Sequence, residues 1–236
     1  MEPKVVWVTG ASEGIGKETA VEFAKAGHTV AISARRKGKL DLLAKRINDG
    51  GGSASAYRCD ITSEKSIRST AGKILKKYGH IDVLINNAGV TVFKSILDTT
   101  TKNFDDIIAT NLRGAFLCIK EVLPGMVKKR SGSIYNILSV AANTTFENSG
   151  AYAASKAGLL ALSSGLRKEV RKYGIRITNI IPGAVETAMW APEMRKKHGK
   201  NMMTTNDVAR VLLDAFNQPQ RVMVEDVVVR PIKGDV

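Results

Sequence analysis

Short apolar runs rich in β-branched residues recur along the chain and alternate with longer segments in which apolar residues return every three or four positions. The short runs predict strands at 4–9, 29–33, 53–58, 82–86, 133–137, 176–181 and 221–229. The longer segments have the period of amphipathic helices and lie at 16–26, 39–48, 64–78, 103–123 and 151–173. This alternation predicts an α/β fold, with a parallel sheet of about seven strands and helices on both faces.

Glycines mark the ends of several predicted elements. Gly27, Gly79 and Gly174 each follow a helical segment, where a left-handed C-terminal cap is expected. The run 49–52, Asp-Gly-Gly-Gly, turns the chain before the third predicted strand. Because the sequence contains no internal repeat, long linker or low-complexity tract, we expect residues 1–236 to form a single doubly wound, Rossmann-type domain.

The composition favours an ordinary globular protein. The chain has 236 residues, of which 44% are hydrophobic, enough for one sizeable core. It has neither a signal-peptide pattern nor an apolar run long enough for a membrane span, so we expect a soluble, cytoplasmic protein. Cys59 and Cys118 are interpreted as buried, reduced residues, and His28, His80 and His198 as solvent-facing or loop residues; no metal site is expected.

The formal net charge of +14 raises nucleic acid, an anionic cofactor or an acidic protein as partners. The basic clusters 76–77, 128–130 and 171–172 fall at predicted helix C-termini, where the helix dipole favours cations. No aromatic residues are interleaved with them, as stacking on single strands would require. A solvated basic surface is therefore a better interpretation than a nucleic-acid groove.

The first predicted strand leads into TGASEGIG, residues 9–16, which opens the first predicted helix. A helix N-terminus with glycines that allow close approach is a typical phosphate site. The spacing of Gly10, Gly14 and Gly16 fits neither G-x-G-x-x-G nor a Walker loop. A glycine-rich turn capped by Ser12, with no ligand, is the alternative.

A candidate acid–base pair follows later in the chain. Tyr152 and Lys156 are four residues apart on a predicted helix and therefore share one face. An ammonium beside a phenol stabilises the phenolate and lowers the phenol pKa. Ser139 follows the fifth predicted strand, at the sheet edge where ligands bind in such folds.

Together these motifs resemble the short-chain dehydrogenase/reductase (SDR) family. The resemblance covers essentially the whole chain, in the family's order: TGASEGIG, Cys59-Asp60, NNAG at 86–89, Asn111 in TNLRG, Ser139, YAASK at 152–156 and PGAVET at 182–187. The G-x-x-x-G-x-G spacing is this family's form of the dinucleotide loop. The resemblance implies an enzyme that reduces a carbonyl to an alcohol by hydride transfer, or catalyses the reverse reaction.

The resemblance also implies roles for individual residues. Ser139 is expected to bond the substrate oxygen and Tyr152 to supply the proton. Lys156 is expected to bind the ribose hydroxyls and lower the tyrosine pKa, and Asn111 to support a water-mediated proton path. The expected cofactor contacts are Gly10, Ser12, Glu13, Gly14, Ile15, Gly16, Arg35, Arg36, Asp60, Ile61, Asn87, Ala88, Gly89, Tyr152, Lys156, Pro182, Gly183, Val185 and Thr187.

The end of the second strand predicts which cofactor is used. An NAD-preferring enzyme usually has Asp or Glu there, against the ribose 2′-hydroxyl, whereas this chain has Ala34, Arg35 and Arg36. Guanidinium groups pair with a 2′-phosphate, which an acidic residue would repel. We therefore expect NADP(H), although RRKGK also fits a charged helix-entry loop.

The substrate is less well predicted. Residues 140–151 and 188–204 are expected to line its pocket and to form a lid, and Phe146, Met189 and Trp190 indicate apolar contact with the substrate, unless they are core or oligomer contacts. The outline is similar to 3-oxoacyl-(acyl-carrier-protein) reductases, and basic residues at 128–130 and 167–172 could meet an acidic carrier protein.

The tail from residue 202 is similar instead to sepiapterin-reductase-like and 3-hydroxy-acid dehydrogenase members, and it lacks a Gly-Gly ending. A non-catalytic nucleotide sensor and a nucleic-acid-binding protein are alternatives from other classes. The resemblance also implies a homodimer or homotetramer through the helices at about 103–128 and 151–172.

Overall fold

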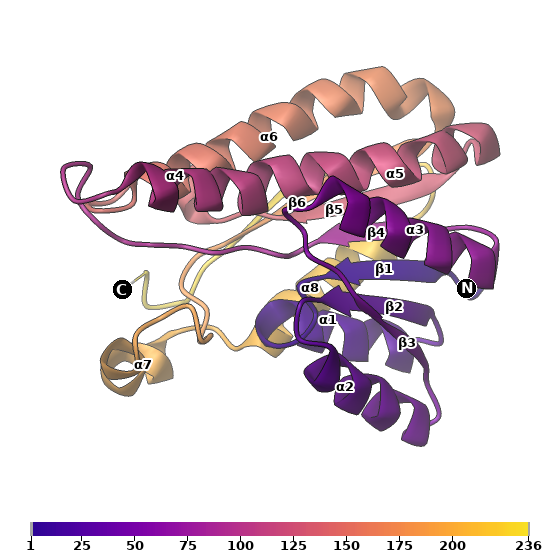
Figure 1. The fold of residues 1–236 in the computed structure, drawn as a ribbon, viewed down its shortest axis with the longest axis horizontal. Helices are drawn as coiled ribbons and strands as arrows, with labels where there is room; N and C mark the ends of the chain where they lie inside the picture. The colour runs from indigo at the N-terminus through magenta and orange to yellow at the C-terminus, as the bar shows by residue number, and fades with distance from the viewer. Residues whose placement is uncertain (1, 236) are drawn as a thin grey trace.

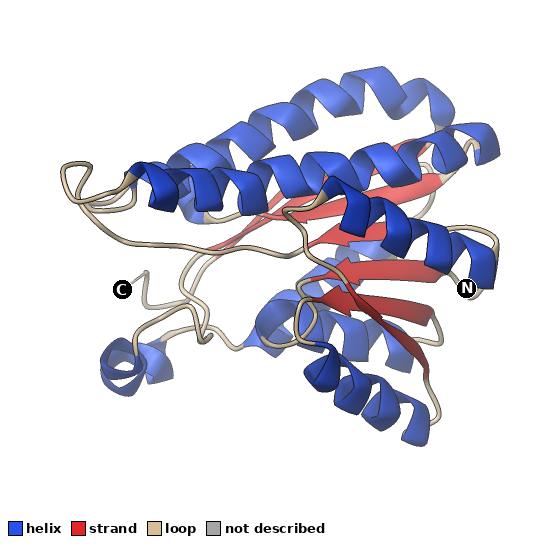
Figure 2. Ribbon diagram, in the orientation of Figure 1, coloured by secondary structure: helices blue, strands red, loops and turns tan. Residues whose placement is uncertain are grey.

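The computed structural model describes residues 2–235, which form one seven-stranded sheet. All neighbouring strands are parallel, in the order β3-β2-β1-β4-β5-β6-β7 (Figures 1 and 2). The strands are β1 Val5–Thr9, β2 Thr29–Ala34, β3 Ser53–Arg58, β4 Val83–Asn86, β5 Gly132–Ile137, β6 Ile175–Pro182 and β7 Asp226–Val229. The predicted doubly wound sheet and its number of strands are confirmed.

Helices cover both faces of the sheet (Figure 1). Helices α1, α2 and α8 lie on one face, and α3, α5 and α6 lie on the other. Two shorter helices, α4 and α7, lie at the edge where the strands end. The helices are α1 Gly14–Lys25, α2 Lys37–Asp49, α3 Glu64–Tyr78, α4 Thr101–Ile108, α5 Gly114–Lys129, α6 Gly150–Val170, α7 Pro192–His198 and α8 Thr205–Phe216. The three predicted capping glycines, Gly27, Gly79 and Gly174, all have positive φ, as expected.

Strand β1 shows how two cores are built from one sheet. Val6 and Val8 face the core beneath α1 and α8, whereas Val5 and Trp7 face the core beneath α3 and α5. Alternate residues of a strand point to opposite faces, so a strand covered on both sides is apolar throughout. The polar end of the fully buried Trp7 is satisfied, because its indole N–H donates to Ser33 Oγ at 2.9 Å.

Two predicted elements differ from the observed ones. The helix predicted over 103–123 is divided by a π-helical turn, Ala109–Arg113, which separates α4 from α5. A π turn inserts one residue into the hydrogen-bond ladder and changes the helical phase, which the apolar pattern alone does not reveal. The last strand begins at Asp226 rather than 221, because only Asp226–Val229 pairs with β6.

His28 corrects part of the histidine interpretation. It lies in the loop before β2 but is buried, 3% exposed, with its ring near Phe23 and Phe216 at centroid distances of 5.8 and 5.1 Å. Its Nδ1 accepts a hydrogen bond from the Lys4 amide at 3.3 Å. The ring therefore serves as an aromatic core residue, with one polar atom satisfied by the backbone.

Both cysteines are buried and free, as predicted. Among the described residues, no cluster of three or more histidine, cysteine or acidic side chains has the arrangement of a metal site. Within 2–235, none of the helices combines the length and hydrophobicity needed to cross a membrane.

Candidate active site

A cavity of about 790 Å³ opens at the edge where the parallel strands end. It collects motifs that are far apart in the sequence, from the loop after β1 to the tail after β7. All but two of the residues predicted from the sequence line it; the exceptions are Gly16 and Asn111. The lining set is Gly10, Ser12, Glu13, Gly14, Ile15, Arg35, Arg36, Asp60, Ile61, Asn87, Ala88, Gly89, Ser139, Tyr152, Lys156, Pro182, Gly183, Val185 and Thr187.

The glycine loop depends on close packing against the segment after β4. A Cβ on Gly10, which has φ +65°, would lie 2.7 Å from the Ala88 Cα, and one on Gly16 would lie 2.2 Å from Asn87 Nδ2. Asn87 Nδ2 in turn donates to Thr9 O at 2.9 Å. Gly16 therefore contributes by letting Asn87 reach β1, rather than by lining the cavity.

The N-terminus of α1 is left without a side-chain cap. Its N-cap residue is Glu13, whose side chain makes no capping hydrogen bond. The alternative in which Ser12 caps the helix is wrong, because Ser12 Oγ accepts from Arg36 Nη2 at 3.0 Å. Uncapped amides and the helix dipole thus border the cavity, and this arrangement suits a phosphate group.

Ser139, Tyr152 and Lys156 meet at one wall of the cavity. Ser139 precedes a 3₁₀ turn, Val140–Ala142, and its Oγ accepts from the Ala141 amide at 3.2 Å. Tyr152 and Lys156 lie in the first two turns of α6, and the Lys156 ammonium is 5.7 Å from the centre of the Tyr152 ring. Lys156 Nζ also donates to the Ile137 carbonyl at 2.7 Å, which fixes the side chain against the end of β5.

Burial dominates the protonation of this pair. It raises the pKa of Tyr152 to about 12, although the Ser139 hydroxyl acts in the opposite direction. Burial also lowers the pKa of Lys156 to about 8. Desolvation of the phenolate is thus the main influence on the Tyr152 pKa, and the expected lowering by Lys156 stays a prediction.

Asn111 lies behind this wall, inside the π-helical turn. The residue is 1% exposed, and its side chain forms hydrogen bonds to the loop after β4 and to α6. Nδ2 donates to Val90 O at 2.9 Å and to Ser155 Oγ at 3.0 Å, and Oδ1 accepts from the Val90 amide at 2.8 Å. The side chain thus joins the loop after β4 to α6 and does not reach the substrate space.

Arg35 and Arg36 follow β2 at the opposite end of the cavity. Arg36 donates to Ser12 and pairs with Glu13, which is also within 3.1 Å of Lys39 Nζ. Beside them, after the neighbouring strand β3, hydrogen bonds from the backbone and side chain of Thr62 hold the pKa of Asp60 low, and Arg35 adds to the effect. This end is polar and charged, unlike the end near Tyr152.

Aromatic side chains surround the entrance to Tyr152. Phe93 lies 5.9 Å from the Tyr152 ring, 5.5 Å from Phe146 and 6.0 Å from Trp190, measured between ring centres. Phe146, Met189 and Trp190 line the cavity, as predicted. Phe93 was missed, although it stands only four residues after the NNAG motif.

The tail after β7 supplies two further lining residues that the sequence analysis missed. Arg230 pairs with Asp235, and Asp235 accepts a hydrogen bond from the Ala184 amide at 2.8 Å. Nothing in the sequence around them indicated a site. They reach the cavity only because β7 pairs with β6 and ends beside it.

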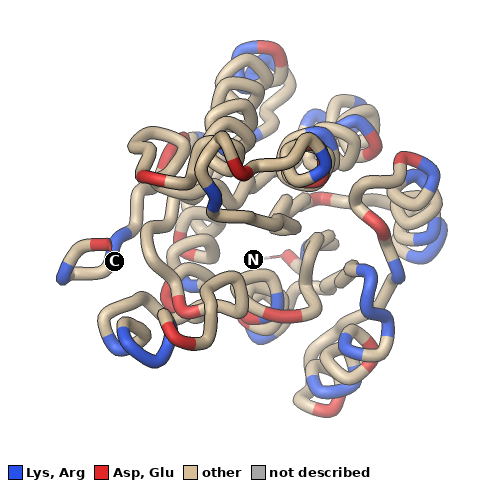
Figure 3. The backbone as a smooth tube through the Cα atoms, turned by 60° about the vertical axis from the view of Figure 1, so that its left-hand side comes forward, with Lys and Arg blue, Asp and Glu red and all other residues tan. Residues whose placement is uncertain are grey.

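The predicted positions of the basic clusters at helix C-termini are confirmed for α3 and α5, and the third follows α6 in a 3₁₀ turn. Figure 3 shows Lys and Arg spread over many helices, with Asp and Glu among them. One member of the predicted docking cluster is misplaced, because Arg167 is buried and bound to Ile177 O and Asp226. Its stem lies on the inner face of α6, where the acidic end of β7 compensates its charge.

Comparisons with known proteins agree with this arrangement. A family model described as short chain dehydrogenase matches residues 4–198. Sepiapterin reductase of Chlorobaculum tepidum is 35% identical over 239 residues, covering 98% of each chain. The 3-oxoacyl-[acyl-carrier-protein] reductase FabG of Thermotoga maritima is 36% identical over 222 residues, covering 94% of this chain and 88% of its own. A metagenomic short-chain oxidoreductase solved in complex with NADP superposes with a TM-score of 0.85 at 32% identity, covering 97% and 96% of the two chains.

Proposed function

We propose that this chain, which belongs to the short-chain dehydrogenase family, is an NADPH-dependent oxidoreductase that reduces a small carbonyl compound to an alcohol. One observation carries the proposal: Ser139, Tyr152 and Lys156 line the same cavity as the glycine loop and the arginines after β2. A proton donor, a hydroxyl for the substrate oxygen and an anion site are thus present in one space.

The residues present fit NADP(H). Gly10 and Gly14 both have positive φ and carry no side chain, so a ligand can approach the backbone of the loop closely. The uncapped amides of α1 follow directly, and such a helix N-terminus favours a pyrophosphate. Arg35 and Arg36 supply cationic groups for a 2′-phosphate. A related short-chain oxidoreductase was solved in complex with NADP, which supports the same cofactor here. When bound, NADPH supplies the hydride.

Tyr152 can serve as the proton donor. Burial raises its pKa to about 12, which makes the phenol a weaker acid, but it is protonated at neutral pH and remains more acidic than the alcohol formed when hydride reaches the substrate carbonyl. Ser139, beside it, is placed to donate a hydrogen bond to the same oxygen, which stabilises the negative charge that develops there. Lys156 is mostly protonated at neutral pH and can donate to ribose hydroxyls. Asn111 acts as a positioning residue, through Val90 and Ser155.

The aromatic entrance favours a substrate with an apolar or flat body. Phe93, Phe146 and Trp190 present ring surfaces around the position of the reacting carbonyl. Segment 188–204, which contains Trp190 and α7, is the proposed lid. A pterin-like ring would match these walls, and the similarity to a sepiapterin reductase supports that class of substrate.

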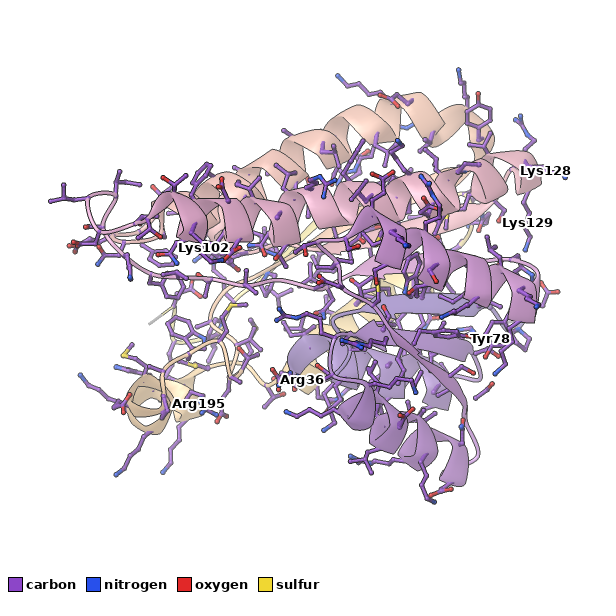
Figure 4. All side chains as sticks on the ribbon, in the orientation of Figure 1. Arg36, Tyr78, Lys102, Lys128, Lys129 and Arg195 are labelled. Atoms are coloured by element: carbon purple, nitrogen blue, oxygen red, sulfur yellow. The ribbon has the colours of Figure 1, made fainter. Side chains whose placement is uncertain are left out.

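A carrier-bound 3-oxoacyl thioester is less well supported. Lys128 and Lys129 lie at the C-terminal end of α5. In Figure 4 this end is far from Arg195, which marks α7. The cluster after α6 is about 29 Å from Tyr152, at about 1.5 Å per helical residue. Within one chain, these two basic clusters and the cavity therefore lie at opposite edges of the sheet.

Self-association is part of the proposal, because large apolar side chains remain exposed on the outer helices. Phe104 on α4 and Phe116 on α5 are 44% and 41% exposed. Association of identical copies through these helices would bury both side chains. Light scattering should give a mass of two or four chains.

The activity is tested by an NADPH-consumption screen across pterins, aromatic ketones, quinones, simple aldehydes, 3-oxo acids and carrier-bound 3-oxoacyl thioesters. We expect free substrates with flat or apolar bodies to have the highest kcat/KM. A clear preference for the carrier-bound thioester would overturn the substrate class, and no NADPH consumption with any carbonyl would overturn the reaction.

A further inference from the structure

The glycine loop carries an acidic side chain, Glu13, close to the place where the 2′-phosphate of NADP(H) is expected to bind. Glu13 is the N-cap residue of α1 and lies on the cavity wall, with its side chain 46% exposed. Its two carboxylate oxygens contact different cations, one just before α2 and one in its first turn: Oε1 is 2.6 Å from Arg36 Nη2, and Oε2 is 3.1 Å from Lys39 Nζ. The hydrogen bond from Arg36 is the main cause of a lowered Glu13 pKa.

These contacts do not cap α1. Glu13 makes no capping hydrogen bond to the helix, which begins at Gly14. Its carboxylate instead reaches across to the start of α2, near the labelled Arg36 in Figure 4. Arg36 therefore has an anionic partner within the protein itself.

A 2′-phosphate and the Glu13 carboxylate compete for the same guanidinium. To reach Arg36, the phosphate must displace the carboxylate or remain beside it, and two neighbouring anions repel each other. The 2′-hydroxyl of NAD(H) carries no charge, leaves the ion pair intact and can donate to the carboxylate. The same side chain thus disfavours one cofactor and accommodates the other.

We propose that Glu13 is a specificity-determining residue that competes with the 2′-phosphate of NADP(H) for Arg36 and Lys39 and so moderates the preference for NADP(H) over NAD(H). The inference rests on the proposed function, since it requires the 2′-phosphate to bind beside α2. Because the ion pair is half exposed, the effect on affinity is modest, about threefold to tenfold.

The test measures binding, so that it does not depend on the substrate. Titration calorimetry of wild type and Glu13→Gln with 2′,5′-ADP and 5′-AMP compares ligands that differ only in the 2′-phosphate. We expect the substitution to tighten 2′,5′-ADP by about fivefold, with 5′-AMP unchanged or weaker. The matched control is Glu22→Gln, which removes a similar ion pair, with Lys25 on the same helix, from a residue that does not line the cavity.

A double-mutant cycle identifies the partner. In an Arg36→Ala background the gain from Glu13→Gln should shrink, because part of the competition has been removed. An unchanged ratio of 2′,5′-ADP to 5′-AMP affinity in Glu13→Gln, with the fold verified by circular dichroism, would overturn the inference and leave the proposed function standing. Failure of the wild type to bind either NADP⁺ or 2′,5′-ADP would overturn both.

Discussion

Replacing Lys156 by methionine should stabilise the cofactor-free protein while removing a functional group. Lys156 is 4% exposed, and burial lowers its pKa from 10.5 to about 8. At about 1.4 kcal/mol per pKa unit, keeping this group charged costs the fold about 3 kcal/mol at neutral pH. Methionine has a similar length and no charge. It also loses the hydrogen bond to Ile137 O, worth about 1 kcal/mol, so the expected net gain is about 2 kcal/mol.

The stability difference between wild type and Lys156→Met should depend on pH. Below pH 8 the folded and unfolded states both hold the Lys156 proton, and the full cost of the buried charge is present. Between pH 8 and 10.5 only the unfolded state holds it, so the stability of the wild type rises with pH relative to the variant. The advantage of Lys156→Met should therefore fade over this window and reverse slightly above it.

Urea unfolding of the cofactor-free proteins, followed by circular dichroism from neutral to alkaline pH, measures this difference. Lys168→Met is the control, because that lysine is exposed on the same helix, and the substitution should leave the unfolding free energy nearly unchanged. The reasoning fails if Lys156→Met is less stable than wild type at pH 7, or if the gap between them is independent of pH.

Three further predictions follow from other parts of the structure. Phe93→Ala should raise KM several-fold for aromatic carbonyls while leaving kcat/KM for small aliphatic aldehydes unchanged; equal losses for both would contradict the aromatic entrance. Arg36→Ala should weaken 2′,5′-ADP about tenfold and 5′-AMP little, as calorimetry can show. Asp82→Asn should lower the unfolding free energy at pH 7 by about 2 kcal/mol. Burial alone would raise the pKa of Asp82, but hydrogen bonds from Lys129 and the Val5 amide lower it overall. The stability that Asp82 contributes is therefore present above its unfolded pKa of 3.8 and is lost as the pH falls below it. The unfolding free energies of wild type and variant should converge in acid.

Local patterns were sufficient to predict most of the fold. Strands such as β1 are buried on both faces, so their sequences are continuously apolar, and helix ends such as that at Gly79 carry a residue suited to positive φ. The exceptions arise from tertiary contacts. His28 is buried because Phe23 and Phe216 pack against it. The sequence around His28 does not show which distant residues will contact it.

The site shows the same division. The glycine loop, Ser139, Tyr152 and Lys156 belong to motifs with fixed spacing, and the structure brings them together at one cavity. The tail residues Arg230 and Asp235 could not be predicted, because the pairing of β7 with β6 carries them there.

Protonation could not be predicted from the sequence either. The spacing of Tyr152 and Lys156 predicts a shared helix face, but it contains no information about burial. It is burial that raises the pKa of the tyrosine and lowers that of the lysine. The sequence therefore predicts the pair, whereas the direction of the tyrosine pKa shift depends on burial.

The most direct test of the proposed reduction is Tyr152→Phe, with NADPH turnover and NADP⁺ binding measured on the same preparation. The substitution removes one oxygen from a side chain that is 6% exposed and leaves its ring contact with Phe93 in place. We expect turnover to fall about 100-fold to 10,000-fold while the NADP⁺ dissociation constant stays the same. Turnover close to that of wild type would contradict the assignment of Tyr152 as the proton donor.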